Sequence, residues 1–314
     1  MPVPDPFHGV SFAGKKGCSV SAPVGSRGYR GWHGPPAFLP GHADGPPPER
    51  KPVPSSPESD QVVFVERTLR KAGLNPRHYR RAPLVRRIPA CLRALKVDSL
   101  AAAMREMESS PDRLLVGLNS LLIGTTAFFR DRQVFDELQR HVLPELLGRV
   151  DRPRVWSAAC SDGAELYSMA MMFDRLGAEP PVFLGTDCRA SAIARAREGL
   201  YPISATAEMP MEFVRNHVRL SGNTATVSPE IRERVSWAKA DLLTQSIDSH
   251  WDLILCRNLA IYLAPEAMDR LWKKLSAAIR PGGYLIVGRA EKPRLEDFSC
   301  IAPCIHQKAP GSIA

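Results

Sequence analysis

The sequence contains no apolar run that approaches the roughly 18 residues needed to cross a bilayer. It also lacks a hydrophobic signal core after its first charged residues, so we expect neither secretion nor membrane insertion. Its seven cysteines are scattered and odd in number, and no His/Cys set stands at zinc spacing. This pattern argues against a disulfide scaffold and a metal site, and it indicates reduced thiols in the cytoplasm.

The start of the chain has few large aliphatic side chains, while residues 1–60 contain 13 prolines and 9 glycines. Such a segment buries too little apolar surface to offset the entropy that is lost on ordering. We therefore predict a disordered tail over residues 1–59.

Residues 60–130 lack any alternating β-branched run, and their apolar positions recur at helical spacing. Residues 61–118 carry 12 Lys/Arg against 5 Asp/Glu, which is most of the excess behind the net charge of +9. We expect a basic helical N-terminal domain over residues 60–130. A basic face steers acidic partners, although a charge run alone is more simply explained as a solvated surface.

Apolar strands alternate with helices in residues 131–296, which predicts a doubly wound, mainly parallel Rossmann-like sheet. A hairpin around Gly222-Asn223 predicts a small β-subdomain inserted at about residues 209–234. We expect residues 297–314 to form a loosely structured C-terminal tail. The predicted strands cover residues 155–160, 182–186, 235–240, 251–256 and 284–288.

Polar residues follow the first two of these strands. Gly163 lets backbone approach a ligand beside a helix N-terminus, but taken by itself it is more simply explained by an ordinary α/β turn. Asp187 stands where an acid commonly accepts hydrogen bonds from ribose hydroxyls, or where it caps the next helix. Together they favour a nucleoside-bearing ligand, while the absence of G-x-G-x-x-G argues against a dinucleotide.

Further polar candidates follow the later strands. Asp241 either caps a turn or approaches an adenine edge. Arg257 and Asn258 end a buried strand, where a charged arginine is costly unless it is paired or lies in a solvated cleft. Tyr262 is either core or cleft wall, and Arg130 is either an anion partner in the cleft or a surface arginine.

Several long motifs stand in a fixed order along the chain, and this order resembles the CheR family of chemotaxis receptor methyltransferases. The motifs are Thr126-Ala-Phe-Phe-Arg130, Trp156-Ser-Ala-Ala-Cys-Ser-Asp-Gly-Ala-Glu-Leu-Tyr-Ser168, Gly185-Thr-Asp187, Cys256-Arg-Asn-Leu-Ala-Ile-Tyr-Leu263, Pro281-Gly-Gly283 and Gly288-Arg-Ala-Glu291.

The resemblance implies S-adenosylmethionine as cofactor and methyl transfer to glutamates of a chemoreceptor or another Glu-rich signalling protein. We expect a monomer with no nucleic-acid partner. Arg130 and Tyr262 would border the methyl group as the catalytic pair. The implied cofactor-binding residues are Thr126, Arg130, Gly163, Glu165, Asp187, Asp241, Leu242, Arg257 and Asn258.

The chain departs from the family pattern at several positions, some of them in residues 161–164, the loop that would hold the methionine moiety (the cofactor loop). Gly124 stands for Asn, Asp162 for Thr and Ala164 for the first of two glutamates. The added carboxylate and the lost acceptor predict weaker cofactor binding than in a typical member. They also keep a second hypothesis open, a degenerate module that binds cofactor or receptor without turnover. A third hypothesis, a nucleic-acid methyltransferase, is favoured only by the basic segment. The sequence lacks the aromatic stacking platform that would bind the bases.

Overall fold

The computed structural model describes residues 57–122, 127–177, 179–247 and 250–311, which belong to one compact unit. Gly124, Thr126 and nearly all of the expected N-terminal tail lie outside the described residues. Within the described ranges, no helix combines the length and apolar character that a bilayer-spanning helix requires.

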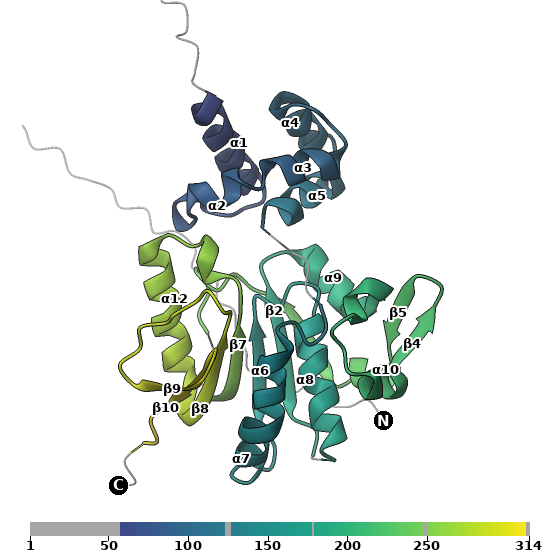
Figure 1. The fold of residues 1–314 in the computed structure, drawn as a ribbon. Coiled ribbons are helices and arrows are strands. Elements are labelled where there is room, and N and C mark those ends of the chain that lie inside the picture. The colour runs from purple at the N-terminus through teal and green to yellow at the C-terminus, as the bar shows by residue number, and fades with distance from the viewer. Residues whose placement is uncertain (1–56, 123–126, 178, 248–249, 312–314) are drawn as a thin grey trace, which may run out of the picture. The chain divides into compact units, whose positions relative to one another are not determined.

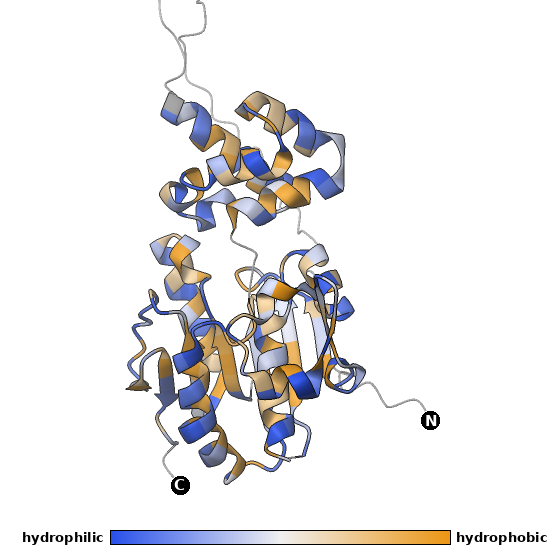
Figure 2. Ribbon diagram, turned by 45° about the vertical axis from the view of Figure 1, so that its right-hand side comes forward, coloured by the Kyte–Doolittle hydropathy of each residue, from blue (hydrophilic) through white to orange (hydrophobic). Residues whose placement is uncertain are grey.

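Helices make up the first described segment, as the apolar spacing predicts. Two of the helices begin at side-chain caps. The hydroxyl of Ser99 accepts a hydrogen bond from the N–H of Ala102, and the hydroxyl of Ser110 accepts one from the N–H of Arg113. The apolar faces meet in one core that includes Leu69, Leu95 and Leu118. Figure 2 shows that each of these helices carries both apolar and polar stretches. The elements are α1 (Pro57–Lys71), η1 (Pro76–His78), α2 (Arg81–Val85), α3 (Ile88–Leu95), α4 (Leu100–Ser109) and α5 (Pro111–Leu121).

A seven-stranded sheet follows, in the order β6-β2-β1-β7-β8-β10-β9 (Figure 1). The first five strands in this order are parallel, which confirms the predicted fold class. The chain turns back at the β1–β7 junction, so β1 marks the topological switch point. The parallel strands are β1 (Arg154–Ala158), β2 (Val182–Asp187), β6 (Val235–Lys239), β7 (Trp251–Cys256) and β8 (Ile279–Val287).

Helices cover both faces of the sheet. One core joins one face to α6, η2, α7, α8 and α9, and a second core joins the other face to α12. Successive strand residues alternate between the two cores; Val155 packs in the first and Trp156 in the second. The bounds are α6 (Arg132–Glu137), η2 (Leu138–Val142), α7 (Leu143–Leu147), α8 (Ala164–Arg175), α9 (Ala190–Glu198) and α12 (Pro265–Ala278).

The expectation of a loose C-terminal tail is wrong. β9 (Phe298–Ala302) and β10 (Ile305–Lys308) form an antiparallel hairpin that pairs with β8 and completes the sheet. Ile305 is the only fully buried residue of the two strands, so the edge hairpin carries too little apolar alternation to be recognised.

The predicted hairpin is present as β4 (Val218–Ser221) and β5 (Thr224–Val227), with Gly222 at φ 55° in the turn. β3 (Leu200–Pro202) adds a third strand, so the β-subdomain begins before the expected residue 209. Its short helices are η3 (Ile203–Thr206), α10 (Met211–His217) and α11 (Pro229–Arg232).

Candidate active site

A cavity of about 90 Å³ lies at the carboxyl ends of β1, β2 and β7, the edge where α/β sheets bind ligands. Residues 159–161, 187–189 and 257–259, which end or follow these strands, form much of its wall. Six residues with predicted roles therefore share one cavity: Arg130, Glu165, Asp187, Arg257, Asn258 and Tyr262.

The segments around this cavity hold strained backbone. Among the described non-glycine residues, eight have positive φ, and five of them lie on these segments. They are Phe129 (54°), Asp131 (60°), Ala159 (61°), Ser161 (55°) and Asn258 (61°). Such strain persists only where the surroundings fix it, and it gathers at functional sites.

Arg257 is the centre of a buried ion-pair network. Its side chain is 2% exposed and bonds Glu165 Oε2 at 3.0 Å and Asp131 Oδ2 at 2.6 Å. A further bond reaches the carbonyl oxygen of Arg130 at 3.0 Å. Arginine at this strand end is therefore both paired and on the cleft wall, which are the two conditions that offset its desolvation.

Both carboxylate oxygens of Asp187 accept hydrogen bonds from neighbouring residues. Its Oδ1 accepts from the backbone N–H of Arg189 and from Arg189 Nε, both at 2.9 Å. Its Oδ2 accepts from the N–H of Ser161 at 3.0 Å and from Arg189 Nη2 at 3.1 Å. Arg189 is the N-cap residue of α9, which has no side-chain cap, so Asp187 orders the loop before the helix.

Glu291 fixes the loop after β7. Its carboxylate accepts from the N–H groups of Asn258 (2.8 Å), Ala260 (2.7 Å) and Gly288 (2.7 Å). Burial raises the pKa of this carboxyl, and the backbone N–H groups act in the opposite direction. The glutamate of the last motif thus supports the loop without lining the cavity.

Replacing Glu291 by glutamine is expected to destabilise the protein by roughly 2 kcal/mol, because the new amide group would face an N–H donor instead of accepting from it. Urea unfolding of the full chain measures the loss. Glu296→Gln, at an exposed position, is the control and should change the unfolding free energy by less than about 0.5 kcal/mol. Equal effects of the two changes would show that the Glu291 bonds contribute nothing.

The chain is similar to known proteins over the region that contains this cavity. A family model described as CheR methyltransferase, SAM binding domain, matches residues 124–301. The chain belongs to the CheR methyltransferase family. Chemotaxis protein methyltransferase of Listeria innocua is 31% identical over 237 residues, which cover 75% of this chain and 90% of that protein.

Two further similarities lie at different levels. Chemotaxis protein methyltransferase 2 of Pseudomonas aeruginosa is 31% identical over 244 residues, covering 72% of this chain and 84% of the relative. Magnesium protoporphyrin IX methyltransferase of Synechocystis PCC 6803, solved with bound SAH, is 15% identical and covers 50% of this chain and 54% of its own, with a TM-score of 0.31. The latter similarity is too weak to support a conclusion.

The CheR domain of this chain binds S-adenosylmethionine as its cofactor, and the cleft offers chemical groups of the right kind. Asp187 supplies a carboxylate for ribose hydroxyls. The buried Nε of Arg257 has no hydrogen-bond partner among the described residues, so a donor is left for a ligand oxygen. Glu165, 13% exposed, supplies an acceptor near the same place.

Three residues with expected cofactor roles do not line the cavity. Gly163 precedes α8 and lies against the ring of Trp237. Asp241 accepts from the N–H of Leu243 at 2.9 Å and so caps a turn, as one of its two interpretations required. Leu242 is buried in the core under α12. Thr126 lies outside the described part of the chain.

Tyr79, Cys188 and Arg189 are among the cavity residues that sequence reasoning missed. Tyr79 comes from the helical segment and forms a bridge with Leu263, so no motif marks it. Burial raises the pKa of Tyr79 and brings that of Cys188 to about 12, which keeps both groups neutral. Arg189 could have been predicted, because it follows the end of a strand by only two residues, where polar side chains reach the carboxyl edge of the sheet.

The β-subdomain touches the cofactor loop directly. The hydroxyl of Tyr201 donates to the carbonyl oxygen of Asp162 at 2.5 Å. The ring of Tyr201 meets that of Phe128 at 4.7 Å between centroids, and the N–H of Phe128 donates to the carbonyl of Ala205. β3 and η3 therefore hold two cleft segments in place.

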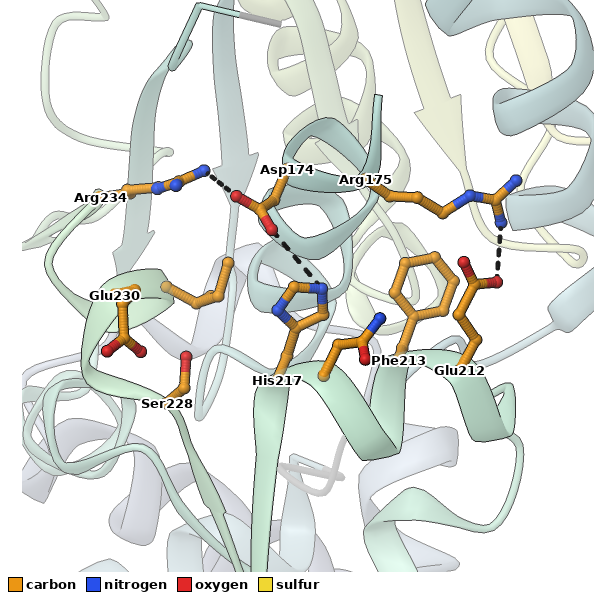
Figure 3. A pocket seen from close by; sticks show the side chains of 10 residues that line it. Asp174, Arg175, Glu212, Phe213, His217, Ser228, Glu230 and Arg234 are labelled. Carbon is orange, nitrogen blue, oxygen red and sulfur yellow. Dashed lines mark hydrogen bonds and ion pairs between the residues drawn. The ribbon is translucent and has the colours of Figure 1, made fainter. Parts of the chain in front are cut away.

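A second cavity of about 400 Å³ lies between α8, α10 and α11 (Figure 3). Its charges compensate one another, since Arg234 bonds Asp174 at 2.6 Å and Arg175 bonds Glu212 at 3.3 Å. It contains none of the residues with expected cofactor roles. Size alone therefore does not identify the active site.

The position of His217 in this second cavity leads us to expect that the stability of the protein depends on pH. Burial lowers its pKa, while Asp174 acts in the opposite direction. The unfolded chain therefore takes up the proton first, and stability is lost as pH falls below about 6.5. The melting temperature of His217→Gln should fall less than that of the wild type between about pH 7.5 and 5.5. Parallel curves for the two proteins would contradict this assignment.

Proposed function

We propose that this CheR-type methyltransferase forms methyl esters on glutamate side chains of a chemoreceptor or a related signalling protein, acting as a monomer in the cytoplasm. The observation that carries the proposal is the convergence of Arg130 and Tyr262 on the same cavity as Asp187, Glu165 and Arg257. Relatives named chemotaxis protein methyltransferases support the choice of acceptor.

In the proposed methyl transfer, the main task of the protein is to position the two reactants. S-adenosylmethionine, when bound, supplies an electrophilic methyl group on a sulfonium. A glutamate is ionised at neutral pH and needs no general base. Arg130 and Tyr262 both line the cavity. In the proposed reaction Arg130 orients that carboxylate as an anion partner, and Tyr262 borders the methyl group. Phe128 and Phe129, which precede Arg130, are buried, and in the proposed reaction their rings help to shield the reacting groups from water.

The helical segment offers a basic surface for an acidic acceptor. Arg77, Arg80, Arg86 and Arg93 are exposed and form no ion pair within the described ranges. Uncompensated positive charge favours a Glu-rich partner and raises its rate of association. We therefore assign the acceptor side of the reaction to this surface.

The test is methyl transfer from radiolabelled S-adenosylmethionine to the signalling fragment of a candidate chemoreceptor. We expect label that mild alkali releases as methanol and that peptide mapping assigns to glutamates. Arg130→Ala should reduce the rate about 100-fold, since one positioned charge contributes roughly 2–4 kcal/mol to such a step. Arg132→Ala, an exposed arginine paired with Asp136, is the matched control.

Alkali-stable label would contradict ester formation. A second candidate function, binding without turnover, is favoured by one observation: Asp187 is occupied by Arg189. Tight binding of S-adenosylhomocysteine with no label on any acceptor would support that alternative.

A further inference from the structure

The guanidinium of Arg189 bonds the carboxylate of Asp187, the residue that is proposed to hold the cofactor's ribose. Nε and Nη2 of Arg189 bond the two carboxylate oxygens of Asp187 at 2.9 and 3.1 Å. Both side chains are nearly buried, at 8% and 4% exposure. This is a bidentate, desolvated ion pair, the strongest geometry available to these groups.

The pair leaves Asp187 no free acceptor site. Each carboxylate oxygen already accepts two hydrogen bonds, and a carboxylate offers about four such sites in all. The cavity is also small, at about 90 Å³, against the roughly 300 Å³ or more of typical small-molecule sites. A nucleoside therefore cannot reach Asp187 while Arg189 holds it.

We propose that Arg189 is a latch residue that closes the cofactor site and must leave Asp187 before S-adenosylmethionine binds. The inference rests on the proposed role of Asp187 in holding the ribose. Binding then carries the free-energy cost of opening the pair, so the apparent affinity falls by the fraction of protein in the open state. The latch gives a reason to expect weak cofactor binding that is separate from the changes at Asp162 and Ala164.

The latch also reaches the helical segment. Arg189 Nη1 bonds Asn119 Oδ1 of α5 at 2.7 Å, and Nη2 lies 3.2 Å from Ser161 Oγ. Opening the latch therefore breaks a contact between α5 and the cofactor cleft. A change that weakens the Asn119 bond should favour the open state and tighten cofactor binding.

Calorimetric titration of the full chain with S-adenosylhomocysteine tests the latch without any acceptor, so the outcome does not depend on glutamate methylation. We expect Arg189→Ala to bind about 10-fold more tightly than the wild type and Asn119→Ala about 3-fold more tightly. Arg195→Ala, which removes the same charge from the same helix, should bind like the wild type.

Unchanged or weaker binding by Arg189→Ala, with its melting temperature preserved, would overturn the latch and make Arg189 a supporting counter-ion. Should Arg189→Ala fail to fold, Asn119→Ala decides alone, and anything but tighter binding counts against the latch. Loss of binding in every protein, wild type included, would overturn the cofactor site itself.

Discussion

Asp187→Ala is expected to weaken binding of S-adenosylhomocysteine by about 100- to 1000-fold. Two hydroxyl hydrogen bonds to a carboxylate contribute roughly 1.5–3 kcal/mol each, and the substitution removes both. It also removes the cost of opening the Asp187–Arg189 pair, about 10-fold, which offsets part of that loss. It also releases the N–H of Ser161, which Asp187 holds at 3.0 Å in the loop after β1. Calorimetry at neutral pH and low salt measures the change directly.

Asp151→Ala is the control for this experiment, because it removes an exposed carboxylate that precedes the amino end of β1 and does not line the cavity. It should leave the affinity unchanged. An affinity of Asp187→Ala within about 3-fold of the wild type would show that the ribose is held elsewhere, for example by Asp241 at the end of β6.

Gly163→Ala is expected to cost roughly 3–4 kcal/mol of stability, the sum of backbone strain and overpacking. Gly163 has φ 88°, and an added Cβ would lie 2.4 Å from the ring of Trp237 and 2.9 Å from Cβ of Ala196. Trp237 has no room to retreat toward β2, where a Cβ at Gly185 would meet the same ring at 2.3 Å. Urea unfolding of the full chain measures the loss.

Gly177→Ala separates the two contributions. Gly177 also has positive φ, 64°, but no atom of the described residues beyond its chain neighbours lies within 4 Å of the added Cβ. We expect a loss of only about 1 kcal/mol there, from backbone strain alone. Equal losses at the two positions would mean that the packing of Trp237 against the cofactor loop is not tight.

The sheet and its carboxyl edge could be predicted because most of its parallel strands are largely apolar runs that are followed by polar residues. Val182–Asp187 and Trp251–Cys256 show this pattern clearly, and both deliver residues to the cavity. The parallel arrangement follows from the intervening helices, and it brings Asp187 and Arg257 to one edge.

The sequence does not reveal which neighbours meet these residues across the fold. Tyr79 reaches the cavity through a bridge to Leu263, which lies far along the chain. The pairing of Asp187 with Arg189 depends on a rotamer and on Asn119 of another helix. β9 and β10 were missed for a different reason, because an edge hairpin buries too few side chains to leave a pattern.

A crystal structure of the full chain with S-adenosylhomocysteine tests the central claim most directly. The account predicts the nucleoside at the carboxyl ends of β1, β2 and β7, with the ribose hydroxyls on Asp187 and with Arg189 released from it. A ligand bound in the cavity between α8, α10 and α11, or a ribose held elsewhere while the Asp187–Arg189 pair stays intact, would contradict it.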